Sequence, residues 1–586
     1  MTSTIRLLFL GFLAIAPAAL AQPAQKNFES IAPEVASGRS EKQAVRTNQY
    51  MAAAANPLAA EAGAAILARG GSAVDSAIAT ALVLNLVEPQ SAGIGGGGFM
   101  LVWDAVQKKL RAFDGRETAP AGVDRRLFYD KAGDRKRFMD AVVGGASVGV
   151  PGMLRMFEQV HAEYGKLPWA DLFQPAIALA ETGFAISPRL YEQLREYTSF
   201  QNNPQAKALF YAPDGNPKPV GSLLVNRALA DTFRRVAKDG AQAFYTGEIA
   251  ADIVHAVRSA PQNPGGMTLE DLAGYRAKER DPVCAPYRAY RVCTMPPPSS
   301  SVNMLQALGI LGHFELGKLA PLSPDAVHLV AQASRLAYAD RDFYVGDPDF
   351  VRMPLEGMTE RGYLSGRARL LDPQRGSAEP ALPGEPPSRH GALLFGRDSA
   401  IELPSTTHVS TVDAERNAVA MTVTIENAFG SHQMVRGFIL NNQLTDFSAA
   451  AEENGRPVAN RIEPGKRPRS SMAPTVVFNA DGSLRLVVGS PGGSRILGYV
   501  LQTVIGVLDW NLDVQQAISL PHYLDRNVGL ELEKNTEAAE LADVMRQRGH
   551  KVSLGDLTSG LQGIEVRGGE LVGGADPRRE GIAVGR

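Results

Sequence analysis

The sequence predicts a protein of the α+β class, in which a helix-rich first part is followed by a strand-rich second part. Two segments with helical spacing lie within residues 56–90, where a Gly-Gly pair separates them and Pro89 ends the second. After residue 404 the pattern changes to short runs of alternating and β-branched residues. A stretch rich in proline and glycine, residues 373–404, joins the two parts and is expected to be extended and exposed.

The strand-rich part begins with two runs that can pair as a hairpin. The expected strands are residues 408–412, 418–425, 438–443, 474–479 and 484–489, followed by a helix at about 496–508.

A glycine-rich run in the first part, residues 93–98, formally satisfies the G-x-G-x-x-G pattern. Dinucleotide binding needs a strand before this pattern and a helix after it, whereas here a helix precedes it and the strand 99–105 follows. The run therefore predicts close backbone packing.

Composition limits the class of partner. The chain has 586 residues, of which 45% are hydrophobic and 21% charged, and its formal net charge is −2. Without a basic field to collect phosphates, nucleic acid is not expected as a partner.

The N-terminal residues 1–21 have the pattern of a signal peptide, with Arg6, an apolar run at 7–16 and a small-x-small site ending at Ala21. The mature chain is then expected to begin at Gln22. The apolar run is short for a spanning helix and no cysteine follows the cut to carry a lipid, so we expect an exported protein, periplasmic or secreted, with no membrane anchor.

Two cysteines, Cys284 and Cys293, flank a segment that can form a hairpin. An oxidising compartment would allow a disulfide between them, and two buried thiols are the alternative. A metal site is poorly supported because two cysteines supply too few ligands.

The hairpin at the start of the strand-rich part brings two threonines together. A turn at residues 413–417 pairs His408 with Thr422 and places Thr406 opposite Thr424. The two hydroxyls would share one face of the sheet within hydrogen-bonding reach. β-Branched residues also suit strands for purely structural reasons, so the pair alone does not establish catalysis.

A nucleophilic Thr406 would need a base. His408 shares its face but lies two strand rises of about 3.3 Å away, so we interpret it as a packed structural histidine. If the peptide bond before Thr406 were cut, the new α-amino group, with a reference pKa near 8, would itself serve as the base.

Eight segments in this order and spacing resemble the motifs of the γ-glutamyltranspeptidases (glutathione hydrolases), and the resemblance spans nearly the whole chain after residue 21. They are GIGGGGFM from Gly93, FDGRETAP from Phe113, MPPPSS from Met295, YADRDFYVGDPDF from Tyr338, TTHVSTVD from Thr406, LNNQLTDFS from Leu440, KRPRSSMAPT from Lys466 and GSPGGSR from Gly489.

This resemblance implies an N-terminal-nucleophile hydrolase with a four-layer αββα sandwich. It implies an inactive precursor that cuts itself between Ser405 and Thr406 into a large subunit, 22–405, and a small subunit, 406–586, which stay together. It further implies no metal or organic cofactor.

The implied reaction cleaves glutathione and other γ-glutamyl compounds through an acyl-enzyme on Thr406, which water, an amino acid or a dipeptide acceptor then intercepts. Thr424 would orient the nucleophile. Gly492 and Gly493 would supply backbone N–H groups for an oxyanion hole, although a tight structural turn also explains these glycines.

The implied substrate has an α-carboxylate, for which Arg116, Ser470 and Ser471 would be the donors. Taken singly, Arg116 is more often a surface ion pair, for example with Glu117.

The substrate's α-ammonium would be held by Asp446 with Gln443, although Asp446 taken singly is more often a loop cap. Glu426 stands where many members of the family have asparagine; it would strengthen ammonium binding, and crowding by a second acid would raise the pKa of one of the two. Residues 447–469 are shortened and lack the tyrosine often found there, so we expect a partial or absent lid.

Two alternatives remain open on sequence grounds. An acylase for glutaryl side chains, such as those of cephalosporins, would use the same nucleophile, but retention of Gln443 and Asp446 argues against it. A secreted binding protein with a dead site is the other. Two bands on a denaturing gel, becoming one in Thr406→Ala, would distinguish an enzyme from a binding protein.

Overall fold

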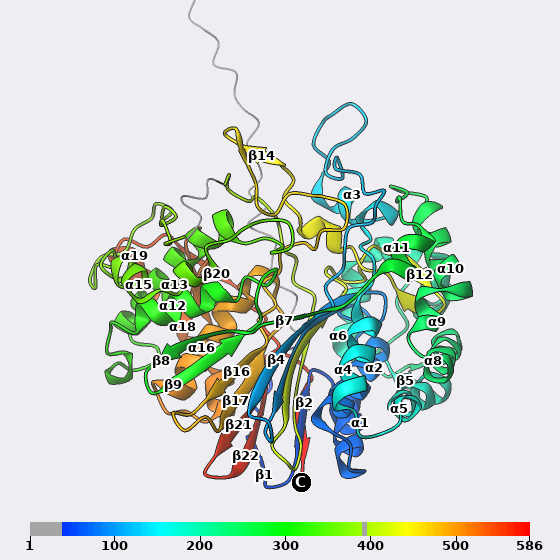
Figure 1. The fold of residues 1–586 in the computed structure, drawn as a ribbon, viewed down its shortest axis with the longest axis horizontal. Helices are drawn as coiled ribbons and strands as arrows, with labels where there is room; N and C mark the ends of the chain where they lie inside the picture. The colour runs from blue at the N-terminus through cyan, green and yellow to red at the C-terminus, as the bar shows by residue number, and fades with distance from the viewer. Residues whose placement is uncertain (1–37, 389–394) are drawn as a thin grey trace, which may run out of the picture. The chain divides into compact units, whose positions relative to one another are not determined.

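The computed structural model describes residues 38–388 and 395–586, all within one packed unit (Figure 1). The expected signal peptide at 1–21 and the expected start at Gln22 lie outside the described residues. Within the described ranges, no helix has both the length and the apolar character needed to cross a membrane.

The first of two central seven-stranded sheets contains the strand that directly follows Thr406. Its strand order is β23-β2-β10-β11-β3-β4-β7, and all of its pairs are antiparallel. The strands are β2 (Met51–Ala54), β3 (Gly97–Asp104), β4 (Lys109–Asp114), β7 (Lys278–Arg280), β10 (Thr407–Val412), β11 (Ala418–Thr424) and β23 (Ile582–Gly585).

The second sheet lies against the first and has the order β1-β22-β21-β17-β16-β9-β8, again antiparallel throughout. Its strands are β1 (Val45–Thr47), β8 (Val283–Tyr287), β9 (Tyr290–Thr294), β16 (Thr475–Phe478), β17 (Leu484–Gly489), β21 (Gln562–Arg567) and β22 (Glu570–Ala575).

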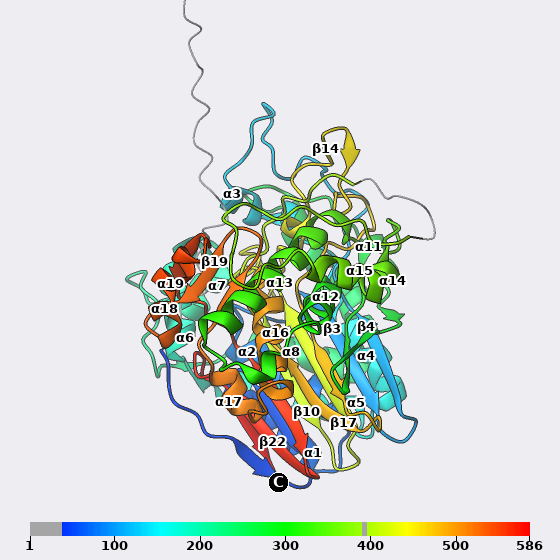
Figure 2. The same cartoon turned by 90° about the vertical axis from the view of Figure 1, so that its left-hand side faces the viewer.

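Helices cover the outer face of each sheet, as the two views show (Figures 1 and 2). The first sheet packs on α1 (Pro57–Ala68), α2 (Ala73–Val87) and α4 (Met153–Tyr164), with α5 (Trp169–Thr182) packed on α2 and α8 (Arg227–Asp239) packed on α5. The second packs on α12 (Val302–Leu311), α16 (Ile496–Leu508) and α17 (Val514–Ser519), with α13 (Pro324–Tyr344) packed on α12. These four layers confirm the expected αββα sandwich.

Alternation along the strands divides the core into two. Val409 and Met421 face the helices of the first sheet, while Phe99 and Leu101 face the second sheet. Both faces of a central strand are thus buried, as a sandwich covered on both sides requires.

Shorter elements surround this frame. They are α3 (Phe138–Val142), α6 (Pro188–Glu196), α7 (Pro204–Phe210), α9 (Gln242–Tyr245), α10 (Gly247–Arg258), α11 (Leu269–Gly274), α14 (Leu355–Met358), α15 (Arg361–Ala368), α18 (Glu537–Glu540), α19 (Ala542–Gln547), β5 (Phe184–Ala185), β6 (Leu223–Leu224), β12 (Met434–Val435), β13 (Phe438–Ile439), β14 (Glu452–Glu453), β15 (Arg456–Pro457), β18 (Tyr523–Asp525), β19 (Leu530–Glu533) and β20 (Val552–Gly555).

The two helices predicted within residues 56–90 are confirmed as α1 and α2, and each has a defined start. Asn56 caps α1 by accepting from the N–H of Leu58. Ser72 caps α2 in a reciprocal capping box with Asp75.

The predicted hairpin register is also confirmed. His408 pairs with Thr422, and the ladder ends at Thr407 and Val423, so the next pair outward is Thr406 and Thr424. Asp413 accepts from the N–H of Asn417 at 2.9 Å, which closes the turn.

The first part is helix-rich, as expected, and it also supplies strands to both sheets. Two expectations differ from the structure. The strand expected at 438–443 is only β13, and a 3-10 helix follows at Gln443–Asp446. The segment 373–404 is not exposed throughout, since Asp398 and Leu403 near its end are buried.

The cysteine pair lies on β8 and β9, where Cys284 and Cys293 are direct cross-strand partners. The structure joins their sulfurs in a disulfide.

Candidate active site

Thr406 and Thr424 lie at adjacent ends of β10 and β11, and their hydroxyls converge on one peptide bond. The two Oγ1 atoms are 3.1 Å apart. The carbonyl oxygen of Ser405 lies 2.7 Å from Oγ1 of Thr406 and 2.8 Å from Oγ1 of Thr424. The peptide bond between Ser405 and Thr406 is intact here, so this is the geometry of a single-chain precursor.

The hydrogen-bond inventory of Thr424 assigns the direction of each proton. Its oxygen accepts from the N–H of Glu426 at 2.8 Å and donates its only proton to the Ser405 carbonyl. The Thr406 hydroxyl can then donate to Thr424, which leaves a lone pair of Thr406 free for the neighbouring carbonyl carbon. Thr424 thus contacts both the Ser405 carbonyl and the Thr406 hydroxyl in one arrangement.

The glycine run at 93–98 makes this arrangement possible. A Cβ on Gly96 would lie 2.1 Å from the carbonyl oxygen of Thr424, and one on Gly98 would lie 2.5 Å from that of Thr422. The predicted close backbone packing is therefore confirmed, and the glycine run packs directly against β11, the strand that carries Thr424.

His408 is fully buried between the sheets. Its ring nitrogens lie 2.8 Å from the hydroxyl of Thr422 and 3.1 Å from that of Ser410. Burial lowers its pKa to about 3, so the ring is neutral at ordinary pH. The structure agrees with its interpretation as a packed histidine.

A small pocket, with about 20 Å³ of water-accessible volume, opens beside the two threonines. Among the described residues, its lining comprises Glu402, Leu403, Thr406, Thr424, Glu426, Gln443, Asp446, Ser470, Ser471, Met472, Gly493 and Ile496. Eight of the predicted site residues therefore meet here.

The two predicted oxyanion glycines precede α16. Gly492 has a φ of 136°, which favours glycine, and Gly493 packs so tightly against the preceding linker that a Cβ would lie 2.7 Å from the carbonyl oxygen of Glu402. In this uncleaved state, the Ser405 carbonyl accepts from the Thr424 hydroxyl, and the oxyanion role of the glycines stays a prediction.

Two buried acids face each other in the cavity. Burial and the nearby charge of Asp446 raise the pKa of Glu426 well above its usual value, and burial raises the pKa of Asp446 to about 6. The expectation that a second nearby acid raises the pKa of one of the two acids is confirmed for Glu426. Gln443 donates to Oδ2 of Asp446 at 2.7 Å, which fixes that carboxylate.

Arg116 is fully buried, so the alternative of a surface ion pair is wrong. Its Nη2 donates to Oδ2 of Asp446 at 2.5 Å and to the carbonyl of Arg469 at 2.8 Å. Two residues expected at opposite ends of a substrate are thus paired with each other. Glu117, 3.8 Å from Nη1 of Arg116, has a pKa raised to about 8 by burial.

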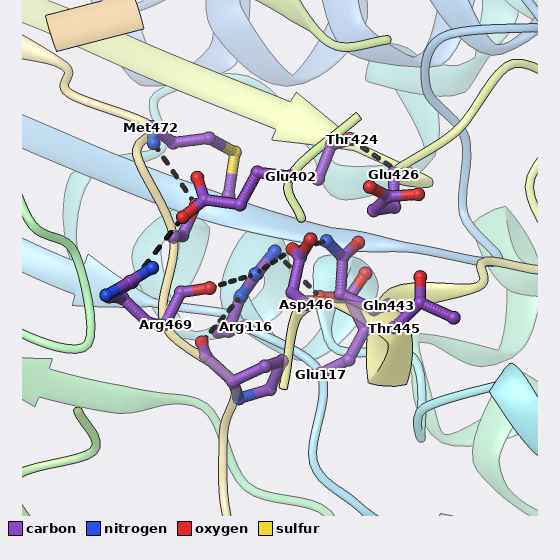
Figure 3. A network of polar contacts seen from close by, with 12 residues as sticks. Arg116, Glu117, Glu402, Thr424, Glu426, Gln443, Thr445, Asp446, Arg469 and Met472 are labelled. Atoms are coloured by element: carbon purple, nitrogen blue, oxygen red, sulfur yellow. Dashed lines mark hydrogen bonds and ion pairs between the residues drawn. The ribbon is translucent and has the colours of Figure 1, made fainter. Parts of the chain in front are cut away.

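Three residues at the cavity were not predicted from the sequence. Glu402 enters the cavity from the linker, where Arg341 and Arg469 pair with its carboxylate. Figure 3 shows Glu402 beside Arg469. Both arginines lie inside recognised motifs, but nothing in the sequence indicated what they face.

A fourth missed residue is Arg579, close to the C-terminus. Its Nη1 donates to the carbonyl of Thr406 at 3.2 Å and its Nε to that of Ser559 at 3.0 Å. It fixes the backbone of the candidate nucleophile from the small-subunit side.

This geometry agrees with comparison to known proteins. The family model described as Gamma-glutamyltranspeptidase matches residues 59–586. The chain belongs to the gamma-glutamyltranspeptidase family. Its fold and its motifs therefore make it an enzyme of this family, with the N-terminal-nucleophile hydrolase architecture.

Relatives within and around the gamma-glutamyltranspeptidase family cover nearly the whole chain. It is 37% identical over 551 residues to the glutathione hydrolase proenzyme of Escherichia coli (strain K12) and 36% identical over 548 residues to that of Bacillus subtilis (strain 168), with 91% of each chain covered. Among solved structures, it is similar to cephalosporin acylase from Bacillus halodurans, with a TM-score of 0.79, 27% identity, and 98% of this chain and 99% of that chain covered.

Proposed function

We propose that this gamma-glutamyltranspeptidase is an exported, self-processing γ-glutamyl hydrolase and transferase. It would act on glutathione and related γ-glutamyl amides through an acyl-enzyme on Thr406. The observation that carries this proposal is the convergence of the Thr406 and Thr424 hydroxyls on the carbonyl of Ser405.

Self-cleavage follows from that convergence. Oγ1 of Thr406 attacks the carbonyl carbon of Ser405, the C–N bond breaks, and the hydroxyl proton ends on the departing nitrogen. Water then hydrolyses the resulting ester, which restores the Thr406 hydroxyl and leaves a carboxylate on Ser405. The new α-amino group of Thr406 has a reference pKa near 8 and is partly neutral at working pH.

Turnover would use the same atoms on an external amide. The α-amino group accepts the hydroxyl proton of Thr406 while Oγ1 attacks the γ-glutamyl carbonyl, and the proton passes to the leaving amine. Gly492 and Gly493 would stabilise the tetrahedral oxyanion, where a single donor typically contributes about 3 kcal/mol. Water or an amino acid or peptide acceptor then releases the glutamyl group.

The charges of the cavity support a zwitterionic donor. Burial raises the pKa values of Asp446 and Glu426, and an α-ammonium group would stabilise their charged forms. Ser470, Ser471 and Arg116 would hold the α-carboxylate, once Arg116 is shared between that group and Asp446. The relatives named glutathione hydrolase proenzyme support glutathione as a donor.

Export to the periplasm or outside the cell is supported by the signal-peptide pattern of residues 1–21. The disulfide between Cys284 and Cys293 fits an oxidising compartment.

A second candidate is an acylase for glutaryl side chains, favoured by the similarity to cephalosporin acylase from Bacillus halodurans. A glutaryl group has no ammonium, so it would leave Glu426 without a cationic partner and Asp446 with Arg116 alone.

Steady-state kinetics of the purified protein distinguish the two. We expect a γ-glutamyl anilide to be cleaved at least about tenfold more efficiently than the matching glutaryl anilide, since a buried charge-assisted contact contributes about 1.5–3 kcal/mol. A dipeptide acceptor should increase anilide release. Equal efficiencies on both donors would overturn the ammonium account.

The nucleophile is tested on denaturing gels. Wild-type protein should give two bands and Thr406→Ala one. Thr407→Val is the matched control, because the buried Thr407 hydroxyl has no hydrogen-bond partner among the described residues. Cleavage of Thr406→Ala at the same bond would contradict the mechanism.

A further inference from the structure

Glu402 lies four residues before the Ser405–Thr406 bond, and its side chain is 6% exposed. Its Oε2 accepts from the backbone N–H of Ser471 at 2.9 Å. Its Oε1 is paired with Arg341 and lies 3.5 Å from Nε of Arg469. An acid of the linker thus occupies donors beside the candidate nucleophile (Figure 3).

The carboxylate of Glu402 is in its charged form. Burial alone would raise its pKa, but Arg341 and Arg469 outweigh that effect and hold the pKa below its usual value. The ionised form therefore makes charge-assisted contacts, which are stronger than neutral hydrogen bonds.

Residues 402–405, from Glu402 to the cleavage point, are held on both sides. The N–H of Leu403 donates to Oε1 of Glu426 at 2.8 Å, and Gly493 packs under the carbonyls of Glu402 and Leu403. Oγ of Ser405 donates to the carbonyl of Gln90 at 2.8 Å. These contacts fix the short segment that joins the Glu402 carboxylate to the cleavage point.

We propose that Glu402 is a positioning residue for self-cleavage. Its carboxylate is bound by Arg341, Arg469 and the N–H of Ser471, which fixes the linker. The fixed linker holds the Ser405 carbonyl against the hydroxyls of Thr406 and Thr424. This role rests on the self-cleavage proposed above. Glu402 transfers no proton; the hydroxyl proton of Thr406 goes to the departing nitrogen, and water completes the hydrolysis.

The anchor also has a consequence after the cut. Glu402 then belongs to the C-terminal tail of the large subunit and still occupies the N–H of Ser471. The tail must leave this position before a substrate carboxylate can use the same donor.

Replacement of Glu402 is compatible with folding. Nη1 of Arg341 lies 3.1 Å from Asp342, and Nη1 of Arg469 lies 3.0 Å from Asp398. Each arginine therefore keeps a carboxylate partner in Glu402→Gln, so the variant leaves no buried guanidinium without an anion.

The test measures the rate at which newly made full-length precursor converts to two bands. Glu402→Gln should convert at least about tenfold more slowly than wild type, because one charge-assisted anchor is lost. Glu402→Asp keeps the charge and should restore part of the rate. Glu385→Gln, an exposed acid of the same linker, should match wild type within about twofold.

Thermal unfolding of Thr406→Ala precursors with and without Glu402→Gln separates positioning from folding: the two melting temperatures should agree within about 4 °C. Conversion of Glu402→Gln at the wild-type rate would overturn the role of Glu402 alone. If wild type itself stays one chain, self-cleavage and the anchor both fail. If Glu402→Asp is as slow as Glu402→Gln, the carboxylate charge is not the anchor and the proposal is overturned.

Discussion

At the scale of single residues, the site is an arrangement of charges that are costly in isolation. Asp446 and Glu426 are buried together, and Arg116, which also is buried, balances only part of their charge. The pKa values of the two acids are raised because both carboxyl groups are buried close together. A cationic ligand group is the simplest way to complete the set.

The pKa of Asp446 predicts how donor binding depends on pH. A carboxyl with a pKa of about 6 loses its negative charge as the pH falls through that value, so the attraction for an α-ammonium weakens. We expect KM for a γ-glutamyl anilide to rise as the pH falls from about 7 to about 5, while KM for a glutaryl anilide stays nearly constant.

The control for this prediction is Asp446→Asn. It should raise KM for the γ-glutamyl donor at least about tenfold at neutral pH and flatten the acid limb of its profile. An unchanged acid limb in this variant would assign the titration to another group, such as Glu426.

At the scale of elements, the glycine-rich run before β3 controls the position of β11. Gly96 can approach the Thr424 carbonyl only because it has no side chain. Backbone packing of this kind positions the Thr424 hydroxyl without contacting it.

Gly96→Ala should therefore lower the free energy of unfolding by about 3 kcal/mol and slow self-cleavage, because the added methyl group meets backbone that must shift. Urea unfolding and the two-band assay measure the two effects. Gly274→Ala, at a helical position with nothing within 4 Å of the added Cβ, is the control and should change neither. Normal cleavage in Gly96→Ala would show that Thr424 tolerates displacement.

The hairpin β8–β9 ends the second sheet and carries the disulfide. Closing a loop of this length by a covalent bond restricts the unfolded chain and stabilises the fold by about 2–3 kcal/mol. Cys284→Ala with Cys293→Ala should lose this amount in chemical unfolding. Dithiothreitol should lower the stability of wild type but leave the double variant unchanged, and equal stabilities would indicate no disulfide in the protein as made.

At the scale of the whole molecule, the two parts on either side of residue 405 are interleaved. In the first sheet, β10 and β11 of the second part lie between β2 and β3 of the first part. In the second sheet, β16 pairs with β9 across the same division. Cutting one peptide bond leaves all of these ladders in place.

We therefore expect the cleaved subunits to remain one particle. Size-exclusion chromatography of the cleaved protein should give a single peak at the elution volume of the Thr406→Ala precursor, and denaturing gels of that peak should show both bands. Separation of the subunits without denaturant would contradict the interleaved sheets.

Much of this site could be predicted from the sequence because its signals are local. The turn at 413–417 determines the hairpin register, and the register alone brings Thr406 to Thr424. Helix caps at Asn56 and Ser72 determine where α1 and α2 begin. The role of Glu402 could not be predicted, because its partners lie more than 60 residues away in the chain.

The sequence by itself determined the helices with local caps and the threonine hairpin, since each depends on neighbours in the chain, and the resemblance to the family pointed to Asp446 and Glu426. Only the tertiary structure decided which strands of the first part enter the two sheets, that Arg116 pairs with Asp446, and that the linker's final residues are buried. These outcomes depend on contacts between segments that are distant in the chain. A charged or backbone polar group that is buried without a partner costs free energy, so each such group must be paired within the folded structure.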